Sequence, residues 1–77
     1  MNRLKELRKN NKLYQKDIAN ILGMSQTGYS QYETETNDIP TNILIKLADF
    51  YNTSIDYILC RTDNKDAYNI NHIDKNK

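Results

Sequence analysis

The 77-residue chain has 38% hydrophobic residues and a net charge of +1, so it can form one domain with a modest core and is too short for a multi-step enzyme. Its single cysteine, Cys60, excludes an intrachain disulfide, which is typical of proteins from a reducing compartment. Charges at the start stand where a signal peptide needs an apolar stretch, and the longest aliphatic run is Ile43–Ile45. We therefore expect a cytoplasmic protein without a membrane span.

The charges are unevenly distributed along the chain. Residues 1–24 carry six Lys and Arg against Glu6 and Asp17, for a net charge of +4, whereas residues 25–60 carry Lys46 against five acidic residues, for a net charge of −4. A basic half beside an acidic half favours a surface that faces a polyanion, although a solvated charged helix explains the same pattern equally well.

Apolar residues that recur at spacings of three and four, with two glycines and one proline in the chain, predict an all-α protein. The first helix is expected to begin at Asn2, as its N-cap, and to end at Asn10. Leu4 and Leu7 share its apolar face. Arg8 lies four residues beyond Leu4 and therefore points partly toward the core.

A second helix is predicted over residues 15–22. Its apolar stripe consists of Ile18, Ile21 and Leu22. Ala19 is a small contact point at which a neighbouring helix can approach closely, and Gly23 supplies the left-handed residue that favours a helix end. Ser25 then caps a third helix. Two helices joined by so short a turn have the spacing of a helix-turn-helix.

The third helix has two different faces. Tyr29 and Tyr32 lie three residues apart and are expected to face inward. The opposite face carries amides and hydroxyls from Gln26, Thr27, Ser30 and Gln31. Such a face is suited to hydrogen bonding.

The second half of the chain predicts two more helices. A polar loop over residues 34–39 ends at Pro40, and a fourth helix runs from Thr41 to Asn52. Its apolar stripe is Leu44, Leu47, Ala48 and Tyr51. A short fifth helix, capped by Thr53 or Ser54, turns Ile55, Ile58 and Leu59 inward. Beyond Arg61 the chain is polar and aperiodic, so we expect residues 62–77 to form a disordered tail.

These features together resemble the Cro/CI-type helix-turn-helix regulators, also called the XRE family. The resemblance covers Leu4 to Arg61 and is carried by three segments: Gln15-x-x-Ile18-Ala19-x-x-x-Gly23, the run from Ser25 to Glu33, and Ile55 to Leu59. It implies a compact five-helix bundle of the lambda-repressor-like DNA-binding type over residues 1–61. It also implies a homodimer, with residues near the fifth helix at the dimer contact.

The resemblance assigns roles to individual residues. Gln26, Thr27 and Gln31 match the base-reading positions; a glutamine can pair bidentately with adenine, and the Thr methyl can contact a thymine methyl. An ordinary solvated helix face is the alternative for the two glutamines. Phosphate contacts are expected from Tyr14, Gln15, Ser25 and Ser30, and Gln15 would also brace the third helix. Four residues match structural positions: Arg8, Ala19, Gly23 and Glu33.

Arg8 and Glu33 resemble a pair that joins the first helix to the end of the third in this family. We expect a partly buried bidentate bridge between them. Two unrelated surface charges, which would contribute little to stability, are the alternative.

Several positions depart from the family pattern. Tyr14 stands where a capping Ser or Thr is common, so its hydroxyl needs another partner, such as a phosphate, or simply packs on the surface. Gly28 weakens the third helix and either permits close approach to DNA or is tolerated. The loop of residues 34–38 lacks the basic residues of relatives, which puts phosphate contacts from it in doubt. Cys60 replaces a frequent Gly, and we expect it to be buried.

Other chemistry finds little support in the sequence. Catalysis needs reactive groups that converge on a pocket, and His72 and Cys60 are too few for a zinc site. Residues 63–74 have the length of a calcium loop, but Lys65 and Tyr68 occupy ligand and glycine positions. We therefore expect no enzyme activity, no cofactor and no metal.

The function predicted from the sequence is specific binding of a double-stranded DNA operator and transcriptional regulation, with repression as its mode. The alternative is a protein-interaction module, such as an antitoxin or an anti-repressor, that uses the same domain to bind a protein partner. The acidic residues 25–60 and the tail are compatible with that alternative. A shift of upstream DNA by the purified chain at physiological salt discriminates between the two.

Overall fold

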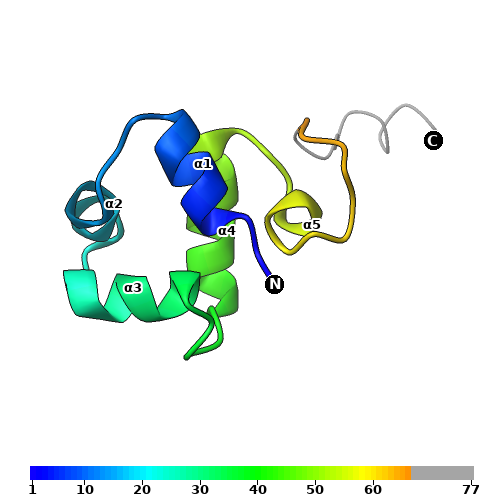
Figure 1. Ribbon diagram of the computed structural model, residues 1–77. Coiled ribbons are helices and arrows are strands. Elements are labelled where there is room, and N and C mark those ends of the chain that lie inside the picture. Colours follow the sequence, from blue (N-terminus) through cyan, green and yellow to red (C-terminus); the bar gives the residue numbers. More distant parts are fainter. Residues whose placement is uncertain (67–77) are drawn as a thin grey trace.

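The spacing of the apolar residues produces helices throughout residues 1–66, the part of the chain that the computed structural model describes (Figure 1). These residues form no strand, and the expected all-α class is confirmed. The helices are α1 (Leu4–Asn10), α2 (Gln15–Leu22), α3 (Gln26–Glu33), α4 (Thr41–Tyr51) and α5 (Ile55–Ile58). In Figure 1, α2 and α3 lie at one end of the view and α5 at the other, with α1 and α4 between them.

All five helices contribute side chains to one core. Its buried members are Leu4, Leu7, Ile18, Ala19, Leu22, Tyr29, Leu47, Ala48, Tyr57 and Ile58. Full burial of a large apolar side chain stabilises the fold by about 1.5–3 kcal/mol, so this set is the main source of stability. Tyr29 is the largest of the fully buried side chains and fixes the inner face of α3 in the core.

Ile21 was expected in the apolar stripe of α2, and this prediction is wrong: the residue is 50% exposed. The buried positions of α2 are Ile18, Ala19 and Leu22. At about 100° of rotation per residue, Ile21 lies roughly 100° from the centre of the arc that these three residues define. A spacing of three residues from Ile18 therefore does not bring Ile21 onto the buried face of α2.

The start of α1 differs slightly from the expectation. The helix begins at Leu4, with Arg3 at the N-cap position. Asn2 nevertheless supplies the capping oxygen, because its Oδ1 accepts a hydrogen bond of 3.1 Å from the Leu4 N–H. Its Nδ2 donates to the Tyr32 carbonyl at 3.0 Å. One side chain thus satisfies a free donor of α1 and joins α1 to the end of α3.

The two candidate caps of α5 have different roles. Ser54 Oγ accepts from the Tyr57 N–H at 2.9 Å and caps the helix. Thr53 is buried, and its hydroxyl donates to the Lys65 carbonyl. Asp63 forms an ion pair of 3.1 Å with Arg3. The first residues after Arg61 therefore contact the domain, whereas residues 67–77 of the expected tail lie outside the described residues.

Within residues 1–66, no helix is both long enough and apolar enough to cross a membrane.

Cys60 follows α5 in a left-handed conformation, with φ of 64°. It is half-buried, and its Sγ lies 3.7 Å from Arg3 Nη1. A residue other than glycine pays about 1–2 kcal/mol in steric cost at such a φ. The backbone conformation explains why a glycine suits this position.

We expect Cys60→Gly to be about 1 kcal/mol more stable than Cys60→Ala, because glycine alone adopts this φ without a Cβ clash, and this gain exceeds its larger entropy loss on folding. Urea unfolding followed by circular dichroism measures the difference. Equal stability of the two variants would show that the backbone at this position is not strained.

Candidate nucleic-acid interface

The turn between α2 and α3 is set by two residues. Gly23 ends α2 in the left-handed region, with φ of 71°, and the Met24 N–H then donates to the Ala19 carbonyl at 2.9 Å. Ser25 begins α3, and its Oγ accepts from the Gly28 N–H at 3.1 Å. These local bonds hold α3 against α2, with the small, buried Ala19 on the packed side.

The inner and outer faces of α3 differ as expected. Tyr29 has no exposed surface, and the partly buried Tyr32 meets its ring edge-on, with centroids 6.4 Å apart. On the outer face Gln26 and Thr27 are exposed, and Ser30 and Gln31 are half-buried. The helix is thus fixed on one side and presents hydrogen-bonding groups on the other.

The outer face of α3 continues onto the start of α2. One hollow on the surface is lined by Gln15, Gln26, Thr27, Ser30 and Gln31. An adjoining hollow is lined by Arg8, Tyr14, Gln15, Lys16 and Gln26. We define the recognition surface as Tyr14, Gln15, Lys16, Gln26, Thr27, Ser30 and Gln31. Six of the seven predicted DNA-contacting residues belong to it, and Ser25 lies directly beside Gln26 without lining either hollow.

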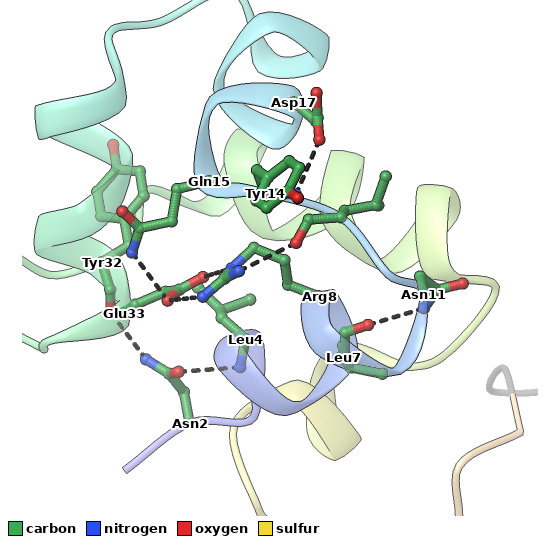
Figure 2. Close-up of polar contacts among 11 residues, drawn as sticks. Asn2, Leu4, Leu7, Arg8, Asn11, Tyr14, Gln15, Asp17, Tyr32 and Glu33 are labelled. Atoms are coloured by element: carbon green, nitrogen blue, oxygen red, sulfur yellow. Dashed lines mark hydrogen bonds and ion pairs between the residues drawn. The ribbon is translucent and has the colours of Figure 1, made fainter.

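A bidentate ion pair lies beneath this surface (Figure 2). Arg8 Nε donates to Glu33 Oε2 at 2.7 Å, and Nη2 donates to Oε1 at 3.1 Å. The two side chains are 10% and 4% exposed. Arg8 Nη1 also donates to the Leu13 carbonyl at 3.0 Å. The bridge that the sequence suggested is therefore present and almost fully shielded from water.

Gln15 joins the same carboxylate from α2. Its Nε2 donates to Glu33 Oε1 at 3.1 Å, as Figure 2 shows. The bracing part of its predicted role is thus visible in the structure. Because one amide hydrogen is used in this way, a phosphate contact from the side chain would rely on the other hydrogen.

The environment of Glu33 keeps its carboxylate charged. Burial alone would raise the pKa of Glu33, but the hydrogen bonds and positive charge of Arg8, with smaller contributions from other neighbours that include Gln15, bring it below the ordinary value. The same hydrogen bond raises the pKa of Arg8. Nearby, burial raises the pKa of Tyr51 to about 12 and also raises that of Tyr29, so both phenols stay neutral at physiological pH.

The start of α2 has a cap that the sequence reading missed. Tyr14 occupies the N-cap position without a side-chain cap bond. Asp17 compensates, because its Oδ2 accepts from the Tyr14 N–H at 2.8 Å. An acidic residue three positions after the N-cap is the signal that would have revealed it. Tyr14 itself is 72% exposed, so its ring and hydroxyl are accessible from solvent.

A side chain at the position of Gly28 in α3 would contact two neighbouring residues. A Cβ at Gly28 would lie 3.1 Å from Met24 Cε and 3.2 Å from Ser25 Oγ. Both distances are tighter than ordinary contacts. A larger residue at position 28 would therefore require the Met24 or Ser25 side chain to shift by a few tenths of an ångström.

The loop after α3 also contacts the outer face of that helix. Asn37 Nδ2 donates to Gln31 Oε1 at 2.7 Å, and the Asn37 N–H donates to the Gln31 carbonyl at 3.2 Å. Glu35, with φ of 65°, lies in the left-handed region within this turn. Residue types alone do not indicate this contact, because it depends on the path of the loop.

Among residues 1–66 there is no group of three or more His, Cys, Asp and Glu side chains that could hold a metal ion. His72 lies outside the described residues.

Comparisons with known proteins agree with this geometry. A family model described as helix-turn-helix matches residues 4–58. The chain is 41% identical over 64 residues to a Bacillus subtilis protein named uncharacterized HTH-type transcriptional regulator YobD, over 83% of this chain and 57% of that protein. It is 40% identical over 57 residues to the HTH-type transcriptional regulator ImmR of the same organism, over 74% of this chain and 45% of the relative.

A third relative, the uncharacterized HTH-type transcriptional regulator YqaE of Bacillus subtilis, is 31% identical over 65 residues, which cover 84% of this chain and 56% of the relative. The chain thus spans about half the length of the curated relatives it matches. No solved structure matches it significantly.

We expect Arg8→Ala to lower the free energy of unfolding by about 3–5 kcal/mol, because it leaves the Glu33 carboxylate buried without its cation. Arg61→Ala is the matched control, since Arg61 pairs with Asp56 at 3.7 Å and both side chains are exposed. That change should cost less than about 1 kcal/mol. Chemical unfolding measures both values. Similar small losses in the two variants would contradict a structural role for the buried pair.

Proposed function

Because this chain belongs to the Cro/CI-type helix-turn-helix family, we propose that it binds a double-stranded DNA operator in a sequence-specific manner and regulates transcription. The observation that carries the proposal is the recognition surface itself. A short helix is fixed by a buried ion pair and exposes amides and hydroxyls on its outer face. A helix of this kind fits the major groove, where each base pair presents a distinct pattern of donors and acceptors.

Within this proposal, Gln26, Thr27 and Gln31 of α3 read base edges. An amide can donate and accept at one base, and the Thr27 methyl can contact a thymine methyl. The exposure of Gln26 and Thr27 supports this assignment, because neither side chain is needed by the core. Phosphates on either side of the groove are contacted by Tyr14, Gln15, Ser25 and Ser30, which fix the register of the helix.

Repression is the proposed mode of regulation, since a domain seated on an operator excludes competing proteins by occupancy alone. We assign the protein to the cytoplasm and propose no catalytic role, as the family is not typically enzymatic. An antitoxin or anti-repressor activity would be favoured instead if the purified chain shifted no DNA and a protein partner co-purified with it.

We expect Gln26→Ala to lower specific affinity by about 1–3 kcal/mol and to relax the preference at one base pair only. The operator is first selected from a random DNA library with the unaltered chain, and variant sites are then titrated. Asn42→Ala, which removes an exposed amide from α4, is the matched control and should leave every preference intact. A Gln26 variant that loses no base preference would rule out its reading role.

The resemblance further suggests a homodimer on two half-sites. Such a dimer should protect one face of the duplex at positions about 34–36 Å apart. The charge of Arg8 is paired with Glu33, whereas Lys9, Lys12 and Lys16 in the basic residues 1–24 are exposed and can approach phosphates. With two or three such cations per protomer, the dimer would neutralise about four to six phosphates, for a slope of log affinity against log salt of about −4 to −5.

Salt titration on the selected site and sedimentation of the complex measure this slope and the stoichiometry. A flat salt response would contradict the DNA-facing assignment of the basic half. One protomer on one half-site at full specific affinity would contradict the dimer.

A further inference from the structure

The loop after α3 holds one of the proposed base-reading side chains in place. Asn37 contacts Gln31 twice: its side-chain nitrogen donates to Gln31 Oε1 at 2.7 Å, and its backbone N–H donates to the Gln31 carbonyl at 3.2 Å. Thr34 Oγ1 donates to the same carbonyl at 3.4 Å. The loop that departs from the family pattern is therefore folded against the outer face of α3.

The contact, which is exposed to solvent, favours one orientation of the Gln31 amide. With Oε1 turned toward Asn37, the Nε2 group and its two hydrogens remain for other partners. Gln26 differs in this respect, because no hydrogen bond engages its amide within residues 1–66, so it can turn either its donor or its acceptor outward. The two glutamines on the recognition surface are thus not equivalent.

We propose that Asn37 is a positioning residue that makes Gln31 present hydrogen-bond donors to DNA and so sets which base Gln31 prefers. The inference rests on the proposed DNA-reading function. Guanine presents two acceptors, O6 and N7, in the major groove, whereas adenine presents one acceptor and one donor. Gln31 therefore prefers guanine, in contrast to the adenine pairing that its residue type alone suggested.

The test starts from the operator selected by the unaltered chain. The base pair at which Gln31→Ala loses its preference is identified, and affinities are measured for all four bases at that pair. The unaltered chain should favour guanine there. Asn37→Ala, which keeps the backbone N–H bond, should reduce this preference by about three- to tenfold, because the Gln31 amide can then turn either its donor or its acceptor toward the base. It should have no further effect on the preference when combined with Gln31→Ala.

Asn37→Asp provides the sharper readout. A carboxylate can only accept, so it should bind Gln31 Nε2 and turn Oε1 outward. The preference should then move from guanine toward a base that presents a donor, namely adenine or cytosine. A general loss of affinity from the added negative charge would apply to all four bases and would not move the preference.

Thr36→Ala, a change in the same loop whose hydroxyl bonds Thr34 and not the Gln31 side chain, is the control and should keep the preference for guanine. Melting temperatures check that each variant is folded. If Gln31→Ala changes base preference but the two Asn37 variants do not, the inference fails and the proposed function stands. If the unaltered chain shows no base preference at any pair, the proposed function fails, and this inference fails with it.

Discussion

The buried ion pair between Arg8 and Glu33 joins α1 to the end of α3 and, through Gln15, to the start of α2. Glu33 is the last residue of α3, Arg8 belongs to α1, and Gln15 of α2 donates to the same carboxylate. Three helices are therefore tied together at one side chain that is 4% exposed. A buried charge is costly unless its partners satisfy it, so arrangements of these helices that separate Arg8 from Glu33 are disfavoured. The fully buried side chain of Tyr29 adds an apolar contact that holds α3 against the core.

The ion pair and Tyr29 together also determine which face of α3 is exposed to solvent. With Tyr29 and Glu33 fixed below, α3 leaves its amides and hydroxyls on the recognition surface. Arg8 neutralises Glu33, which would otherwise place an uncompensated negative charge beneath a surface proposed to meet phosphates. The recognition surface contains one cation, Lys16, among neutral groups. On the proposed function, hydrogen bonds supply specificity there and the other exposed lysines of the basic half add affinity.

Local signals predicted most of the fold, and long-range contacts account for what they missed. Gly23, Ser25 and Ser54 mark helix ends through bonds to residues at most five positions away, which a sequence displays directly. The Arg8–Glu33 bridge was suggested by family resemblance, because periodicity cannot pair residues 25 positions apart. The exposure of Ile21 depends on which side of α2 is covered by the other helices, which local periodicity does not show. The contact between Asn37 and Gln31 depends on the path of a loop, for which residue types alone give no rule.

On the proposed function, the buried carboxylate of Glu33 orients α3 for specific reading of DNA. Glu33→Gln keeps the shape of the side chain and removes its charge, and circular dichroism can establish that the variant is folded. The decisive measurement is the ratio of its affinity for the selected operator to its affinity for unrelated DNA. We expect this ratio to fall below that of the unaltered chain while binding to unrelated DNA is retained. An unchanged ratio in the folded variant would contradict this role of Glu33.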